Sequence, residues 1–154
     1  MPLPTQRPAS RLSPSECDRM DPQPHPMRFP PDHPLVERVR AMSMRYPEAV
    51  EAIAHGRCTF RAGKRQFAIV GAAHDDEEAL EFLPDPLERE ALLERDDVFV
   101  PAYEGAYGWL AIRVDAVSGP WDLVAELIDA SYRRVALVRQ LRALDADPVV
   151  RLRE

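Results

Sequence analysis

Cysteine is scarce in this sequence. The two cysteines, Cys17 and Cys58, are too few for the disulfide framework that small exported domains commonly need. Long apolar runs are also missing. No stretch approaches the roughly 18 consecutive apolar residues of a membrane helix, and the first residues lack the apolar core of a signal peptide. These absences predict a cytoplasmic protein that has no membrane contact.

Catalytic and metal-binding motifs are missing as well. The sequence contains no Gly-x-Ser-x-Gly, no His-Glu-x-x-His and no glycine-rich phosphate loop. His55 and Cys58 have the spacing of two metal ligands, but a closed zinc site needs about four. The acidic run 75–78 lacks the glycine and the alternating ligands of a calcium loop. We therefore predict a protein that is not an enzyme and has no catalytic residue, no cofactor and no metal site.

Proline is distributed unevenly along the chain. Ten of the 16 prolines lie within the first 34 residues, where no hydrophobic period is sustained. The whole chain has 154 residues, which is the length of one domain and a little more. Met1, Met20 and Met27 all stay open as the translation start. The pattern predicts a disordered proline-rich leader over 1–31, a folded domain over 32–144 and a short C-terminal tail over 145–154.

Hydrophobic periodicity predicts three helices and six strands. Apolar residues recur every three or four positions in the first and last helical segments and alternate in the last two strands, and the other strands are short β-prone runs. The helices are predicted over 34–46, 86–95 and 120–144, and the strands over 49–55, 58–62, 65–73, 79–83, 98–103 and 110–114. Short turns join most of the strands, which favours antiparallel pairing. The fold class predicted is α+β, a single compact domain in which a mostly antiparallel sheet of about six strands packs with three helices.

Two local signals make this prediction more specific. Asp85 can cap the second helix, Pro86 suits its first position, and Glu88 can complete a capping box. Gly63-Lys64 is a short hairpin turn, because glycine takes the positive φ that such turns need. The predicted core consists of Phe60, Phe67, Ile69, Phe82, Leu92, Leu110, Ile112, Trp121, Val124, Ile128 and Val135.

Four short segments carry a resemblance to a known family. They are His55-Gly56-Arg57-Cys58-Thr59-Phe60-Arg61, Gly63-Lys64 through Phe67-Ala68, Pro101-Ala102-Tyr103 with Gly108-Trp109-Leu110, and Ser131-Tyr132. This ordered set resembles the MmcQ/YjbR family of small bacterial proteins over about residues 35–142. The resemblance implies a curved antiparallel sheet, no established catalytic set, and DNA binding through a fold likened to a double wing. The chain departs from the family at 79–83, where Glu81 lies in a strand that commonly carries a lysine.

Charge is segregated along the chain. The net charge of -6 and the pI of about 5.3 argue against a basic nucleic-acid binder. However, the blocks 55–73 and 131–144 contain basic residues and no acidic ones, whereas 75–97 is strongly acidic. A basic block creates a local positive potential within about 10 Å, even on an acidic protein. The candidate phosphate contacts are Arg57, Arg61, Lys64, Arg65, Arg134, Arg139 and Arg142.

Aromatic residues surround the glycine turn at 105–108. Tyr103, Tyr107 and Trp109 fit either a stacking platform, with Tyr107 as the candidate stacking residue, or the rim of the core. With the resemblance, the sequence predicts a monomeric DNA-binding module that contacts phosphates through the 57–65 hairpin and the C-terminal helix. The alternative is a protein-interaction module that binds an acidic protein partner and no nucleic acid.

Overall fold

The computed structural model describes residues 26–71 and 78–147. Within them, six strands form one antiparallel sheet in the order β1-β2-β3-β4-β6-β5. The strands are β1 (Ala49–Ala54), β2 (Arg57–Ala62), β3 (Arg65–Val70), β4 (Ala79–Phe82), β5 (Val98–Phe99) and β6 (Leu110–Arg113). The helices are α1 (Pro34–Ser43), α2 (Arg89–Leu93), α3 (Trp121–Val135), α4 (Val138–Ala146) and the short 3-10 helix η2 (Glu104–Tyr107). The α+β prediction is confirmed.

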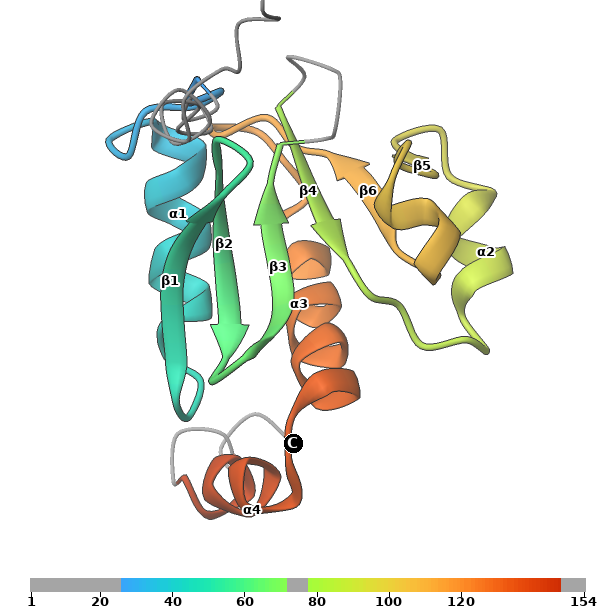
Figure 1. Ribbon diagram of the computed structural model, residues 1–154. Coiled ribbons are helices and arrows are strands. Elements are labelled where there is room, and N and C mark those ends of the chain that lie inside the picture. The colour runs from blue at the N-terminus through green and yellow to red at the C-terminus, as the bar shows by residue number, and fades with distance from the viewer. Residues whose placement is uncertain (1–25, 72–77, 148–154) are drawn as a thin grey trace, which may run out of the picture.

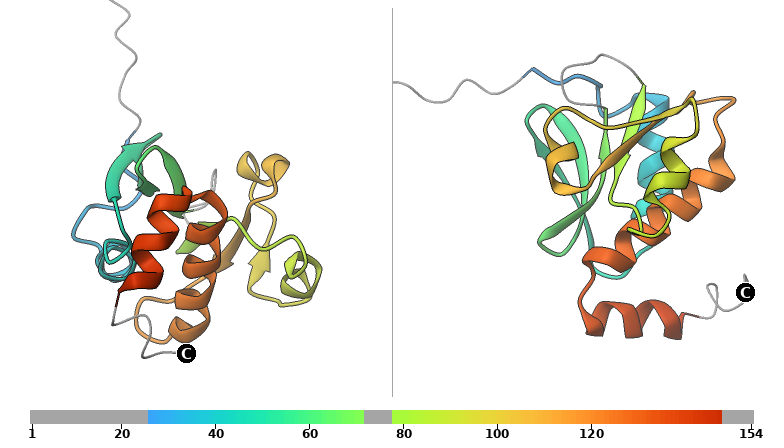
Figure 2. Two further views of the ribbon diagram at one scale, coloured as in Figure 1. Left: turned by 90° about the horizontal axis from the view of Figure 1, so that it is seen from below. Right: turned by 90° about the vertical axis from the view of Figure 1, so that its right-hand side faces the viewer.

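Helices α1 and α3 cover one face of the sheet (Figure 1). Helix α2, β5 and η2 gather at the β6 end of the sheet, and α4 lies beyond the C-terminal end of α3 (Figures 1 and 2). The core fills the space between the sheet and the two covering helices. The predicted core residues are buried, except that Trp121 is half-buried and packs at the edge of the core. The guanidinium carbon of Arg38 lies 4.3 Å from the centre of the Trp121 ring.

The folded part extends upstream of residue 32. Phe29 is only 8% exposed and packs edge-on against the His33 ring, with 4.9 Å between the ring centres. The N–H of Arg28 donates a hydrogen bond to the Gly56 carbonyl at 3.0 Å. A domain boundary read from proline density misses this contact, because one buried ring leaves no periodic pattern. The remainder of the predicted leader, 1–25, lies outside the described residues.

A chain that begins at Pro31 is expected to be less stable than a chain that begins at Met27. Only the longer chain keeps Phe29, and burying a phenylalanine side chain contributes about 1.5–3 kcal/mol. Thermal melting followed by circular dichroism compares the two chains. The control is the Met27 chain with Phe29→Ala, which should melt close to the Pro31 chain. Equal melting temperatures for the Met27 and Pro31 chains would contradict the assigned contact.

Helix α2 is shorter than the sequence predicts. It begins at Arg89 rather than at Pro86. Asp85 does act as a cap, but of a turn, because its Oδ1 accepts a hydrogen bond from the Leu87 N–H at 2.9 Å. The N-cap residue is Glu88, whose side chain makes no capping hydrogen bond. The capping-box prediction is therefore wrong, because Asp85 to Glu88 form a turn and the helix begins only after it, at Arg89.

The helix predicted over 120–144 is two helices. Ala136 and Leu137 are extended, with ψ of 147° and 159°, and they separate α3 from α4. The Leu137 N–H donates to Oε1 of Gln140 at 2.7 Å, which caps the start of α4. The break lets α4 turn back toward the sheet, where Gln140 and Leu144 are 1% and 3% exposed. Burial of these side chains therefore overrides the helical period. Among the described helices, none is long and apolar enough to cross a membrane.

Candidate functional site

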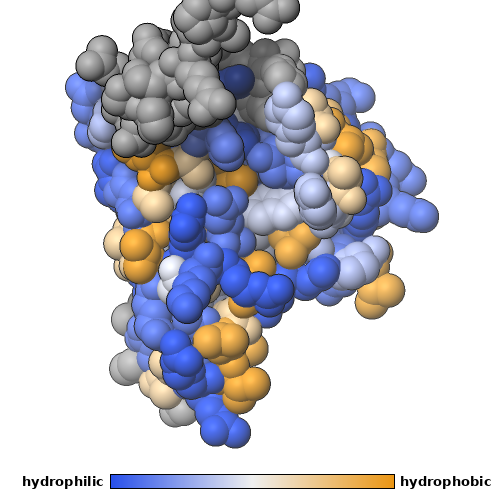
Figure 3. All heavy atoms as spheres, in the orientation of Figure 1, coloured by the Kyte–Doolittle hydropathy of each residue, from blue (hydrophilic) through white to orange (hydrophobic). Residues whose placement is uncertain are grey.

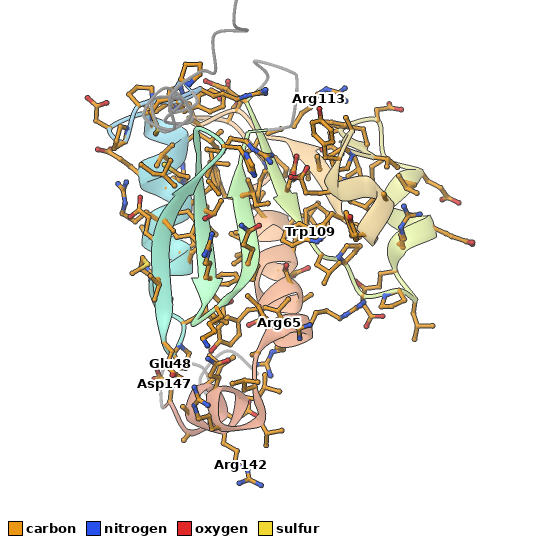
Figure 4. All side chains as sticks on the ribbon, in the orientation of Figure 1. Glu48, Arg65, Trp109, Arg113, Arg142 and Asp147 are labelled. Atoms are coloured by element: carbon orange, nitrogen blue, oxygen red, sulfur yellow. The ribbon has the colours of Figure 1, made fainter. Side chains whose placement is uncertain are left out.

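A cleft opens at the end of the sheet where β3 begins and β4 ends. Its volume is about 480 Å³. Figure 4 shows Arg65 and Trp109 in this region, and Figure 3 shows hydrophilic residues across the middle of the same face. The lining combines basic and apolar side chains, namely Arg61, Lys64, Arg65, Gln66, Leu83, Trp109, Arg134 and Val135. Strands β2 and β3, the segments after β4 and before β6, and the last turn of α3 each contribute to it.

The β2–β3 turn brings two of the basic side chains to the cleft. Ala62 pairs with Arg65, so the loop consists of only Gly63 and Lys64. Gly63 has a φ of 65°, which a residue with a side chain adopts only with strain. The predicted hairpin turn is thereby confirmed. It projects Lys64 at the tip and places Arg65 at the first position of β3.

A β-bulge in β3 sets the direction of the neighbouring side chains. Phe60 pairs with Ala68 and Arg61 pairs with Gln66, so Phe67 has no partner on β2. The Phe67 ring packs among aromatic rings of the core, while both members of the Arg61 and Gln66 pair line the cleft. The bulge therefore lets one short strand supply the core and the cleft with adjacent residues.

The cleft is strongly basic. Four of its lining side chains are cationic and none is acidic. Arg134 is held at the rim, because its Nη1 donates to the Pro84 carbonyl at 2.8 Å. Nε of Arg61 is buried and has no hydrogen-bond partner among the described residues. A buried donor without a partner typically costs about 1–3 kcal/mol.

Trp109 forms part of the apolar side of the cleft. The chain leaves the sheet after Phe99, so β5 is shorter than the predicted strand 98–103, and it returns through η2. Gly108, with a φ of 91°, ends η2, and the backbone N–H of Trp109 donates to the Glu104 carbonyl at 3.3 Å. The indole is half-buried and lines the cleft. Tyr107 is 82% exposed and lies outside the lining.

Arg57 lies elsewhere, in the interior. It is only 6% exposed, and its Nη1 donates both to Glu81 and to the Gly71 carbonyl, each at 3.0 Å. Its Nη2 donates to Glu104 at 2.5 Å. Arg57 thereby ties β2 to β4 and to η2, and its guanidinium is not available to a phosphate. The prediction that Arg57 contacts phosphate at the surface is wrong. Arg57 belongs to a basic stretch of the sequence, but its side chain pairs with carboxylates in the interior.

The environment of Glu104 is set by that same guanidinium. Burial raises the pKa of the Glu104 carboxyl, but the hydrogen bond from Arg57 and one from the backbone outweigh burial. The pKa of this carboxyl is therefore below its ordinary value. Because η2 carries both Glu104 and the carbonyl that binds Trp109, the buried ion pairs also position one wall of the cleft.

The two candidates on α4 do not join the cleft. Arg139 is paired with Glu48, with 3.0 Å between Nη2 and Oε1. Arg142 points away from the body of the molecule at the far end of α4 (Figure 4). The structure thus brings together Arg61, Lys64, Arg65 and Arg134 of the predicted set. Gln66 and Leu83 also line the cleft, and no local sequence signal distinguishes them.

Metal ligands are not assembled in the part of the chain that the structure describes. No group of three or more His, Cys, Asp or Glu side chains there is placed to hold a metal ion. Cys58 is 3% exposed, and burial raises the pKa of its thiol. A raised pKa keeps the thiol protonated and unreactive.

The family assignment rests on a sequence comparison. The model of the YjbR family matches residues 44–134, which is more than half of the chain. The chain belongs to the YjbR family. No curated protein matches it. The YjbR match extends from just before β1 to the last turn of α3, and it includes every lining residue of the cleft except Val135.

Proposed function

We propose that this YjbR-family chain binds DNA weakly through its phosphates, at the basic cleft. The observation that carries the proposal is that four cationic side chains, three from the β2–β3 hairpin and one from α3, line one cleft with no acidic lining residue. They are Arg61, Lys64, Arg65 and Arg134. The proposal leaves out three residues of the predicted phosphate-binding set. Arg57 is buried, Arg139 is paired with Glu48, and Arg142 does not line the cleft.

The net charge of -6 does not oppose this proposal. A phosphate responds most strongly to charges within about 10 Å of screening length, and no acidic side chain lines the cleft. Arginine suits phosphate because its planar guanidinium can donate two parallel hydrogen bonds, and Lys64 adds a point charge at the hairpin tip. Such contacts orient a strand without reading its bases, so little sequence preference is expected.

Binding to duplex DNA is expected to weaken steeply with salt. Each neutralised phosphate contributes a slope of about -0.9 to log K against log salt, so four contacts give about -3.6. The double substitution Lys64→Gln with Arg65→Gln should reduce the magnitude of that slope by about 1.8 and weaken all sequences equally. Fluorescence anisotropy of labelled DNA over a salt series measures both effects.

The matched control removes the same charge from α4. Arg139→Gln with Arg142→Gln should leave the slope within error of the unsubstituted chain, because neither residue lines the cleft. If the unsubstituted chain shows no salt-dependent binding to DNA at tens of micromolar in low salt, the proposal is wrong. The cleft charges would then be reassigned to the acidic protein partner of the alternative prediction.

A further inference from the structure

The cleft also has features that bear on the kind of strand it accepts. We infer that it takes an unpaired nucleotide of single-stranded DNA, with the base stacked on Trp109 and the adjoining phosphates on the basic side chains. This inference rests on the proposed function and adds to it the strandedness of the DNA and the residue that contacts a base.

The lining has two chemically different sides. Trp109, Leu83 and Val135 are apolar or aromatic, whereas the remaining lining residues are the four cations and Gln66. A phosphate ion alone would make no favourable contact with the apolar side. A nucleotide needs both, because its base is flat and largely apolar on its faces and its phosphate is anionic. The pairing of an indole with several cations in one cleft therefore matches a nucleotide better than a free anion.

The dimensions of the cleft also favour an unpaired base. Its volume of about 480 Å³ lies within the roughly 300–1,000 Å³ of small-molecule pockets. In a duplex, each base is stacked between its neighbours and offers only its edges, whereas a single strand can turn a base face onto an aromatic side chain. A stacking residue inside a cleft of this volume is therefore accessible to a single strand and not to an intact duplex.

Trp109 is held in place for such contact. The Gly108 φ of 91° ends η2, the Trp109 N–H binds the Glu104 carbonyl, and Arg57 fixes the Glu104 side chain. These contacts order the backbone at Trp109, so less conformational freedom is lost on stacking than for a residue in a flexible loop. Tyr107, which was the stacking residue expected from the sequence, is exposed and outside the lining. Stacking on Trp109 and stacking on Tyr107 therefore predict different effects of substitution, and the two assignments can be compared by experiment.

The first experiment compares two single strands of equal length, one normal and one abasic. Both carry the same phosphates, so only a base contact separates their affinities. The unsubstituted chain should bind the normal strand more tightly by on the order of 5- to 150-fold, the range for one base stacked on an aromatic residue. Trp109→Ala should remove that preference, while Trp109→Phe and the control Tyr107→Ala should keep most of it.

The second experiment uses tryptophan fluorescence. Trp109 and Trp121 are the two tryptophans of the chain, so Trp121→Phe leaves Trp109 as the single reporter. Normal single-stranded DNA should quench its emission at low salt, whereas the abasic strand and a duplex of the same sequence should not. This measurement needs no substitution at the site, and it still decides the question if Trp109→Ala fails to fold.

The outcomes separate this inference from the function on which it rests. If the normal and abasic strands bind equally, or if duplex binds more tightly than the single strand, base stacking on Trp109 is refuted while phosphate binding stands. If the Tyr107→Ala variant loses the preference and Trp109→Ala keeps it, the stacking residue is wrongly assigned. If no DNA binds at low salt, the proposed function fails and the inference fails with it.

Discussion

Replacing Arg57 with Met is expected to lower the free energy of unfolding by about 3–5 kcal/mol. Arg57 and Glu81 are 6% and 0% exposed, and the Glu104 side chain is 21% exposed. Methionine fills a similar volume but leaves two carboxylates facing each other without their cation. Removing one partner of a buried ion pair typically costs this much, because the remaining charge is stranded in the interior. Urea denaturation followed by circular dichroism measures the change.

The control removes the two carboxylates together with their cation. Adding Glu81→Gln and Glu104→Gln to Arg57→Met should recover a large part of the lost stability, because no uncompensated carboxylate then remains. A cost below about 1 kcal/mol for Arg57→Met alone would show that the ion pairs do not hold the fold together. A triple variant no more stable than the single one would show that packing of Arg57, and not its charge, accounts for the loss.

The response to pH separates charge from packing further. With Arg57 present, the pKa of Glu104 in the folded chain is lowered, so this group adds stability above its unfolded pKa of about 4.3 and loses it as pH falls through the folded pKa. Without Arg57, the largest interaction that opposes burial is lost, so the pKa of Glu104 is higher in the variant than in the unsubstituted chain. The stability gap between Arg57→Met and the unsubstituted chain should therefore narrow as the pH is lowered toward 4.

The hairpins could be predicted from the sequence, because their turns depend on local backbone conformation. His55 and Gly56 have φ of 52° and 75°, and Gly63 has 65°, so glycines mark both turns of the first three strands. Alternating apolar residues indicated β5 and β6, although the strand predicted over 98–103 ends at Phe99. The two helical errors have a different origin, since the turn at Asp85 and the break before α4 depend on contacts that no helical period encodes.

Arg57 shows why part of the candidate site could not be predicted. Its partners Glu81 and Glu104 are 24 and 47 residues away along the chain. A basic residue within a basic stretch of sequence suggests a solvated surface. Glu81 was interpreted only as a position where the family commonly has a lysine. The structure makes both observations parts of one buried interaction. Conversely, Arg134 and Trp109 come to the cleft from segments that share no local pattern with the β2–β3 hairpin.

Replacing Tyr132 with Ala is expected to cost about 3–5 kcal/mol, as other removals of a buried aromatic ring do. Tyr132 is completely buried on α3. Its ring centre lies 4.5 Å from that of Tyr46 and 5.2 Å from that of Phe67, and its hydroxyl donates to the Pro47 carbonyl at 2.8 Å. The residue therefore joins α3 to β3 and to the segment before β1, close to the end of α3 that supplies Arg134 to the cleft.

Tyr132→Phe separates the ring from the hydroxyl. It keeps the ring and should cost only about 0.5–1.5 kcal/mol, the usual value of one hydrogen bond.

Burial, with the nearby charge of Glu48, raises the pKa of Tyr132 to about 12. Because an unfolded tyrosine ionises near pH 10, the group's contribution is complete below pH 10 and is lost as the pH rises toward 12. Urea denaturation at pH 8, 10 and 11 should therefore show the gap between the unsubstituted chain and Tyr132→Phe closing above pH 10. A gap that stays constant over this range would mean that the Tyr132 hydroxyl is not buried as described. Equal costs for the Ala and Phe variants would mean that the ring contributes nothing to joining α3 to the sheet.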